Sequence, residues 1–239
     1  MRRLAAIAAL AALAAAPVRA AVMDDFIMFD RSYIPALALT NQPQKPQGAI
    51  DESMRRLDAA WAKLLAALPA SDKADPAYAA AIARADKGIK EAQRLSREGS
   101  RAAAHGALEE VRVAFWEART KKGVDFYQDG MTSFHETMEA FTDLAGKPDA
   151  DTKKLRELLD ESSALWQKVE AAQFDAARFG FDADRTARLQ GLVKKEREVL
   201  TQLDAALKAG DRVRLAEGAK AMKGTFSQAY LLFGDFTGL

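Results

Sequence analysis

An internal repeat is the feature that most constrains how this chain can fold. Over residues 48–68, core positions recur at spacings of four and three, the pattern of one helix face. The same ladder returns further along the chain, where Trp61 falls on Trp166 and Pro43 falls on Pro148. The two ladders are Ile50, Met54, Leu57, Trp61, Leu64 and Leu68, and then Leu155, Leu159, Ser162, Trp166, Val169 and Gln173. The repeat predicts two structural units built on one plan.

The later part of each unit repeats in a second register with a larger offset. Gly99 and Gly123 fall on Gly210 and Gly234, and the apolar positions near them also correspond. These positions are Tyr78, Ile82, Ile89, Ala104, Leu108, Val111, Phe115 and Ala118, and then Leu189, Val193, Leu200, Leu215, Ala219, Met222, Phe226 and Ala229. Because the offset grows between the two registers, we expect an insertion around residues 174–184. The alternative is that any Ala/Leu-rich helical chain aligns with itself. A chance alignment, however, would not also match glycines and prolines in the same order as the apolar ladders.

Helix-forming residues dominate the chain and strand signals are nearly absent, so we expect an all-α protein. Pro76 after Asp75 predicts a helix start, while Gly210 and Asp211 predict the end of one helix and the cap of the next. Pro35 is expected to bend the first helix. The eight expected helices span residues 22–40, 48–68, 76–98, 101–122, 124–145, 151–178, 183–209 and 212–233.

Four amphipathic helices joined by short connections favour an up-down-up-down bundle. We therefore expect two tandem four-helix bundles related by duplication, over residues 21–122 and 123–239. Each bundle is expected to bury one tryptophan, Trp61 in the first and Trp166 in the second.

Residues 1–20 have the pattern of a signal peptide. Arg2 and Arg3 precede an uncharged run over residues 4–16, and Val18 and Ala20 provide small residues before a cleavage site. The run is shorter than the roughly 20 residues that span a bilayer, so we expect cleavage after Ala20 rather than a retained membrane anchor, the alternative. The sequence thus predicts a periplasmic protein. It has no cysteine, so a lipoprotein anchor and disulfides are excluded.

The charge balance limits the class of partner. The full chain has a formal charge of +1, and removal of the three signal arginines leaves about −2. Such a mixed surface does not favour nucleic acid. Catalytic motifs are also missing from the sequence: there is no Gly-x-Ser-x-Gly elbow, and the residues three before His105 and His135 are Ala102 and Thr132, not the glutamates of a di-iron bundle. We therefore expect a non-enzymatic protein with no resident cofactor.

The last two helices resemble a known family. They contain the segments 203–207 (Leu-Asp-Ala-Ala-Leu), Gly210, 215–223 and Ala229-Tyr230, and the first unit has Leu-Glu-Glu at 108–110 and Ala-Phe at 114–115. This pattern is similar to the soluble periplasmic b-type cytochrome, a single-haem four-helix bundle. The resemblance implies an axial His after the aromatic residue of the last helix and an axial Met near the start of the first.

The place of that axial histidine is occupied by other residues in this chain. It holds Trp116 in the first unit, and Leu231 or, by the internal register, Ser227 in the second. The resemblance therefore implies the fold of the family without its axial His. A haem-binding electron carrier stays as an alternative function.

One group of side chains is a candidate metal site. Met131, His135 and Met138 lie at positions i, i+4 and i+7, so they share one helix face. Two thioethers and an imidazole suit Cu(I) or haem iron, and a copper or metal carrier is a further alternative. In the competing interpretation the methionines are core residues and His135 pairs with Glu139. The internal repeat supports packing, since Asp30 occupies the place of His135.

Three other features could take part in binding. Met23 and Met28 stand among acidic residues, which could bind a ligand but equally well favour a helix N-terminus. His105 is expected at the surface. The C-terminal aromatic residues form a docking patch or close the core; they are Phe226, Tyr230, Phe233 and Phe236. The function best matched by these observations is binding of an unknown protein or small-molecule partner, with an enzyme the least favoured class.

Overall fold

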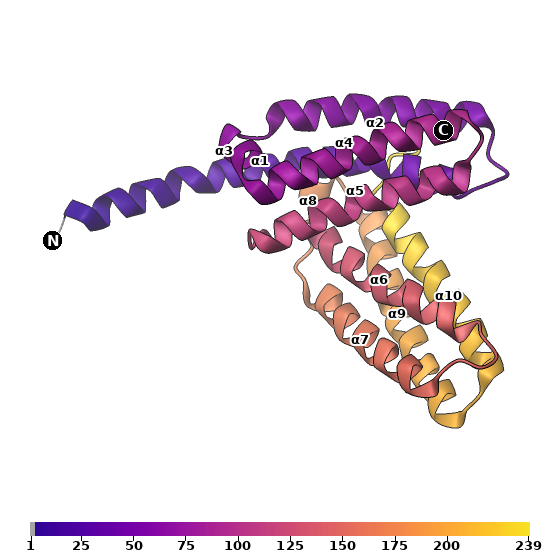
Figure 1. Ribbon diagram of the computed structural model, residues 1–239. Helices are drawn as coiled ribbons and strands as arrows, with labels where there is room; N and C mark the ends of the chain where they lie inside the picture. Colours follow the sequence, from indigo (N-terminus) through magenta and orange to yellow (C-terminus); the bar gives the residue numbers. More distant parts are fainter. Residues whose placement is uncertain (1–2) are drawn as a thin grey trace. The chain divides into compact units, whose positions relative to one another are not determined.

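The computed structural model describes residues 3–239 of the chain, with side chains from residue 22 onward. Ten helices and no strand occur in this described range, so the all-α prediction is confirmed (Figure 1). None of its helices is long and apolar enough to span a membrane. The predicted signal peptide, residues 1–20, lies outside the residues whose side chains are described.

Eight long helices carry the fold, and two short helices lie in the connections between them. The long helices are α1 (Arg3–Thr40), α2 (Gln47–Ala67), α4 (Pro76–Arg97), α5 (Arg101–Lys121), α6 (Tyr127–Ala145), α7 (Thr152–Ala171), α9 (Ala183–Ala209) and α10 (Arg212–Leu231). The short ones are α3 (Ala70–Ala74) and α8 (Ala176–Phe179). The prediction of one continuous helix over residues 151–178 was wrong at its C-terminal end. Helix α7 ends at Ala171, and the short helix α8 follows. The carboxylate of Asp175 caps α8 by accepting from the Arg178 N–H.

Local signals explain the helix boundaries. Asp75 caps α4 by accepting from the backbone N–H groups of Ala77 and Tyr78, with Pro76 as the first helical residue. Gly210 ends α9 with a left-handed φ of 68°. A side chain at that φ is strained, and this is why glycine ends the helix there.

The chain divides into two compact units. Unit 1 contains residues 1–118 together with 234–239, and unit 2 contains residues 119–233. The C-terminal segment 234–239 thus groups with unit 1, whereas the sequence placed it in the second bundle. Within unit 1 the Asp235 N–H donates to the carbonyl oxygen of Arg31 at 2.8 Å, and Arg56 Nη1 donates to that of Thr237 at 2.8 Å.

Unit 1 is built from α1, α2, α4 and α5. The Tyr33 hydroxyl donates to the Leu108 carbonyl oxygen at 2.7 Å and joins α1 to α5, while the Trp61 indole N–H donates to Asp86 Oδ1 at 3.3 Å and joins α2 to α4. The Trp61 ring lies 5.9 Å, between centroids, from each of two phenylalanines, Phe29 and Phe115. These three buried rings form the centre of the core.

Unit 2 is built from α6, α7, α9 and α10. Each helix contacts the next in the order α6, α7, α9, α10 and back to α6, so α6 and α9 are diagonal partners. The Trp166 ring lies 4.6 Å from that of Phe134, which lies 5.7 Å from Phe226. Both tryptophans are buried, as the repeat predicts. The two aromatic trios occupy positions that correspond in the sequence repeat, and α3 and α8 lie in equivalent connections.

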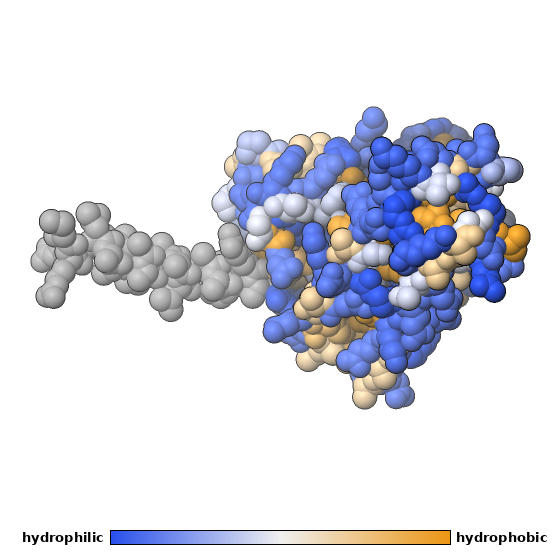
Figure 2. All heavy atoms as spheres, turned by 90° about the horizontal axis from the view of Figure 1, so that it is seen from below, coloured by the Kyte–Doolittle hydropathy of each residue, from blue (hydrophilic) through white to orange (hydrophobic). Residues whose placement is uncertain are grey.

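Hydrophilic residues cover most of the face seen in Figure 2, and apolar residues are scattered among them. Among the described residues, the large apolar side chains that are exposed are Met28 and Val213. Neither belongs to the core ladders. The apolar positions of the repeat are thus used for packing inside the two units.

Candidate functional site

The three residues of the candidate metal site have different environments. Met131 and Met138 are fully buried among the core residues of α6, next to Phe134 and Phe141. His135 lies at the edge of that core, with its side chain 15% exposed and its ring 5.2 Å from that of Phe226. The helix therefore directs the two thioethers inward and carries the imidazole on its flank.

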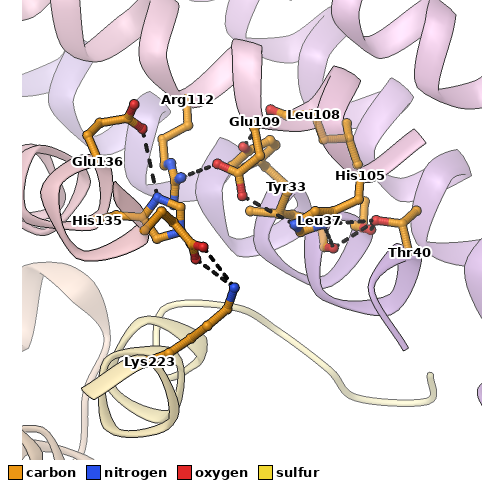
Figure 3. Close-up of polar contacts among 12 residues, drawn as sticks. Tyr33, Leu37, Thr40, His105, Leu108, Glu109, Arg112, His135, Glu136 and Lys223 are labelled. Atoms are coloured by element: carbon orange, nitrogen blue, oxygen red, sulfur yellow. Dashed lines mark hydrogen bonds and ion pairs between the residues drawn. The ribbon is translucent and has the colours of Figure 1, made fainter. Parts of the chain in front are cut away.

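The imidazole of His135 is engaged by carboxylates. Its Nε2 lies 3.3 Å from Glu139 Oε1 one turn along α6, and Nδ1 lies 3.8 Å from Glu136. Lys223 of α10 pairs with Glu139 at 2.8 Å. Figure 3 shows His135, Glu136 and Lys223 gathered at this edge of unit 2. Burial raises the pKa of Glu139, but hydrogen bonds from His135 and Lys223 outweigh it and bring the pKa to about 2.

The other histidine was wrongly expected at the surface. His105 is half-buried in unit 1, where its Nδ1 lies 2.8 Å from the carbonyl oxygen of Leu37 and its Nε2 lies 3.3 Å from Glu109 (Figure 3). Because a carbonyl oxygen only accepts, Nδ1 carries the proton in that contact. Glu109 also pairs with the buried Arg112. His105 thus ties α5 to the end of α1.

The structure does not gather the early methionines into a site. Met28 is 56% exposed, whereas Met23 is half-buried. The positions that correspond to the axial histidine of the b-type cytochromes, Trp116, Ser227 and Leu231, are all half-buried. The Ser227 hydroxyl donates to the Lys223 carbonyl oxygen at 2.7 Å, inside its own helix.

Glu196 is the functional candidate that sequence reasoning missed. Its side chain is fully buried, and neither carboxyl oxygen has a hydrogen-bond partner. Burial raises its pKa to about 9, with Lys195 acting weakly in the opposite direction, so the carboxyl is neutral at pH 7. The signal was present in the spacing: Glu196 stands two helical turns from both Leu189 and Leu203, which are buried on the core face of α9. A carboxylate in a core ladder is a stronger signal than carboxylates on a solvated face.

The internal repeat shows what is unusual about this position. In the register that aligns Gly99 with Gly210, Glu196 corresponds to Ala85, which is fully buried in unit 1. In the register that aligns the two ladder tryptophans, Met131 and Met138 correspond to Phe26 and Tyr33. At these three positions unit 1 has two aromatic residues and an alanine, whereas unit 2 has two methionines and a glutamate. Unit 1 therefore has no carboxyl at the position equivalent to Glu196.

Arg119 and Asp129 form a second buried polar group in unit 2. Arg119 Nε and Nη2 donate to the two carboxylate oxygens at 2.8 and 2.5 Å, and the guanidinium lies 4.5 Å from the centroid of Phe126. The bidentate geometry gives two charge-assisted hydrogen bonds between the same two groups. The pair fixes the turn between α5 and α6, which is a structural role.

An aromatic cluster packs around α8 within unit 2. The rings lie 4.9–6.5 Å apart between centroids, and they are Tyr127, Phe174, Phe179, Phe181 and Phe233. Burial raises the pKa of Tyr127 to about 12. Phe226, Tyr230 and Phe233 are buried, and Phe236 is half-buried. Three of the four C-terminal aromatic residues therefore pack in the core rather than form an exposed patch.

Among the described residues, no group of three or more His, Cys, Asp or Glu side chains is placed to hold a metal ion. Comparison with known proteins adds no assignment: no family model, no curated protein and no solved structure matches this chain.

Proposed function

We propose that this chain is a non-enzymatic binding protein of the periplasm and that the interior of unit 2 holds its ligand. One observation carries the proposal. The carboxyl of Glu196 is fully buried in the core of unit 2, and both its oxygens lack a hydrogen-bond partner.

The energetic argument rests on the cost of this arrangement. A buried polar group without a partner costs about 1–3 kcal/mol of stability. Natural proteins pair nearly all such groups, and exceptions concentrate at functional sites. Ala85 occupies the equivalent place in unit 1, so the bundle does not need a carboxyl for packing. A ligand that pairs with Glu196 would recover the missing interactions.

The cell compartment is proposed from residues 1–20, which have the order of a signal peptide: basic start, apolar run, small residues. The near-neutral charge of residues 21–239 favours a small ligand or a protein partner over nucleic acid.

The test is mass spectrometry of protein recovered from the periplasm of an expressing strain. Denaturing conditions should give an intact mass that begins at Ala21. Native conditions should show an additional bound mass, and this mass should be absent from Glu196→Ala. Glu198→Ala is the matched control, because Glu198 is an exposed glutamate on the same helix. A bound mass that survives Glu196→Ala would contradict the assignment to unit 2. Equal native and denaturing masses for the unaltered protein would contradict the binding function.

A haem-binding electron carrier is the second candidate, through the resemblance to the b-type cytochromes. The observation in its favour is that Met131 is buried near the start of α6, the first helix of unit 2, where that family has its axial Met. The opposite axial place holds Ser227 or Leu231, which cannot supply a nitrogen ligand to iron. We therefore place this function second.

A further inference from the structure

A proline inside α1 leaves one helix carbonyl without its usual donor. In an α-helix the carbonyl oxygen of residue 31 accepts from the N–H of residue 35, but Pro35 has no N–H. The backbone N–H of Asp235 takes over this role and donates to the Arg31 carbonyl oxygen at 2.8 Å. The hydrogen bond that the proline removes from α1 is thus replaced by one from the C-terminal segment, residues 234–239.

Unit 1 holds the C-terminal segment at two further points. Arg56 of α2 donates from Nη1 to the carbonyl oxygen of Thr237 at 2.8 Å. Gly234 is buried against α1, where a Cβ placed on it would lie 3.0 Å from atoms of both Ile34 and Pro35. A residue with a side chain would therefore hold the segment away from the helix. Contacts from two helices fix the segment on one defined surface.

The docked segment is folded by its own hydrogen bonds. The Asp235 side chain accepts from the Thr237 N–H at 3.1 Å, and the Leu239 N–H donates to the Phe236 carbonyl oxygen at 3.1 Å. A segment that forms turns by itself loses less conformational entropy when it docks. Because these bonds lie within residues 235–239, a separate peptide of the same sequence is able to form them.

Charge also matches the segment to the surface. Hydrogen bonds from Thr237 lower the pKa of Asp235, and the positive charges of Arg31 and Arg56 act in the same direction. The two arginines belong to α1 and α2, the helices that hold the segment. The surface therefore favours an anionic residue directly after the buried glycine.

The internal repeat shows that this surface is particular to unit 1. In the register that aligns Trp61 with Trp166, the residues that form it correspond to three glutamates and an alanine. Arg31, Ile34, Pro35 and Arg56 fall on Glu136, Glu139, Ala140 and Glu161. Ala140 has the backbone N–H that Pro35 lacks, and the three glutamates would repel an anionic residue such as Asp235. Unit 2 does not repeat the chemistry of the surface.

We propose that the surface of unit 1 formed by Arg31, Ile34, Pro35 and Arg56 is a docking site for a short C-terminal peptide, and that residues 234–239 are its intramolecular ligand. The ligand class is a turn-forming segment with the order Gly-Asp-Phe-Thr-Gly. The partner that supplies it in trans is a second copy of this chain, which carries the same segment and exchanges it as in domain swapping. The site does not involve Glu196, so it is independent of the function proposed for unit 2.

The first test follows the Asp235 amide by residue-level hydrogen exchange in the mature chain. Pro35→Ala restores the donor within α1, so the Asp235 amide should lose its acceptor and exchange at least about tenfold faster. Arg56→Ala should also speed its exchange. Arg55→Ala is the matched control, because Arg55 is the exposed neighbour and bonds within its own helix, and it should leave the exchange unchanged. Circular dichroism verifies that each variant is folded.

The second test opens the site in the full chain. Asp235→Pro removes the donor N–H from the chain's own segment. A fluorescently labelled synthetic peptide of residues 232–239 then stands for the segment of a second copy, and an anisotropy titration should show one peptide bound per Asp235→Pro chain. Binding to the unaltered chain should be at least about tenfold weaker, since its own segment competes at a high effective concentration. Adding Arg56→Ala to Asp235→Pro should weaken binding likewise, whereas adding Arg55→Ala should not.

Any one of three outcomes overturns the docking site. The first is unchanged exchange of the Asp235 amide in Pro35→Ala. The second is equal peptide binding by the unaltered chain and the Asp235→Pro chain, which would place the peptide elsewhere. The third is no peptide binding by the Asp235→Pro chain, which would make the segment a fixed part of unit 1 rather than a ligand.

Discussion

The indole nitrogen of Trp166 donates a hydrogen bond to the backbone carbonyl oxygen of Val193, and the two atoms lie 3.0 Å apart. This contact ties α7 to α9 at the centre of unit 2. Trp61, the repeat equivalent in unit 1, donates instead to the carboxylate of Asp86 at 3.3 Å. The ring position is shared by the two units, while the acceptor differs. The indole is therefore placed by packing in the bundle, and each unit supplies its own acceptor.

Replacing either tryptophan should destabilise the unit that contains it. Trp61→Ala and Trp166→Ala each remove a large buried ring and leave a cavity, so we expect a loss of about 3–5 kcal/mol. Urea denaturation followed by circular dichroism measures the loss. Trp116→Ala is the control, because Trp116 is half-buried and lies outside the ladders, and it should cost less. Equal losses in all three variants would contradict the core role of the two ladder tryptophans.

The stability of unit 2 should fall as the pH rises from about 4.5 to about 9. Glu196 has a pKa of about 9 when folded, against an ordinary value of 4.5. Between these values the folded state holds a proton that the unfolded state has lost, so a rising pH favours unfolding. The slope approaches about 1.4 kcal/mol per pH unit. Denaturation at pH 5, 7 and 9 measures it.

Two substitutions check that this slope comes from Glu196. Glu196→Gln removes the titrating group and should flatten the dependence over that pH range. Glu196→Leu should flatten it and also raise the free energy of unfolding, since leucine continues the ladder of Leu189 and Leu203. Glu198→Gln, an exposed change on the same helix, should keep the slope of the unaltered protein. A slope that persists in Glu196→Gln would assign it to another group.

Breaking the buried pair of Arg119 and Asp129 should be costly. Asp129→Ala leaves a buried guanidinium without its carboxylate, and we expect a loss of about 3–5 kcal/mol. The exposed pair of Arg94 and Glu98 provides the contrast, since Glu98→Ala should cost only about 0–1 kcal/mol. Thermal denaturation of both variants compares the two effects. The double change Arg119→Met with Asp129→Leu should recover much of the loss, because no charge is then left buried.

Protein produced with haem available should lack tightly bound b-type haem. Trp116, Ser227 and Leu231 occupy the possible places of the axial histidine, and none of their side chains ligates iron. His135 is the imidazole nearest the core of unit 2, and Met131 and Met138 on its own helix cannot reach the opposite face of a haem. The absorption spectrum should show no sharp Soret band. A Soret band that disappears in His135→Ala would contradict this expectation.

Several of the local predictions hold because their causes lie within a few residues. The cap of Asp75 acts two and three residues along the chain, and the left-handed Gly210 ends its helix regardless of what packs on it. The break after Ala171 was missed, since the segment before Asp175 has no proline or glycine to mark it.

By itself the sequence determined the helical class, the order of the long helices and the two buried tryptophans. Helix formation depends on neighbours three and four residues away, so periodicity and caps are readable from one chain. Only the tertiary structure decided that Glu196 lies in a core while Glu198 on the same helix is exposed. It also placed His105 against Leu37 and grouped residues 234–239 with unit 1. These outcomes depend on side chains from distant segments, because burial and hydrogen bonding of a polar group are set by the helices that pack around it.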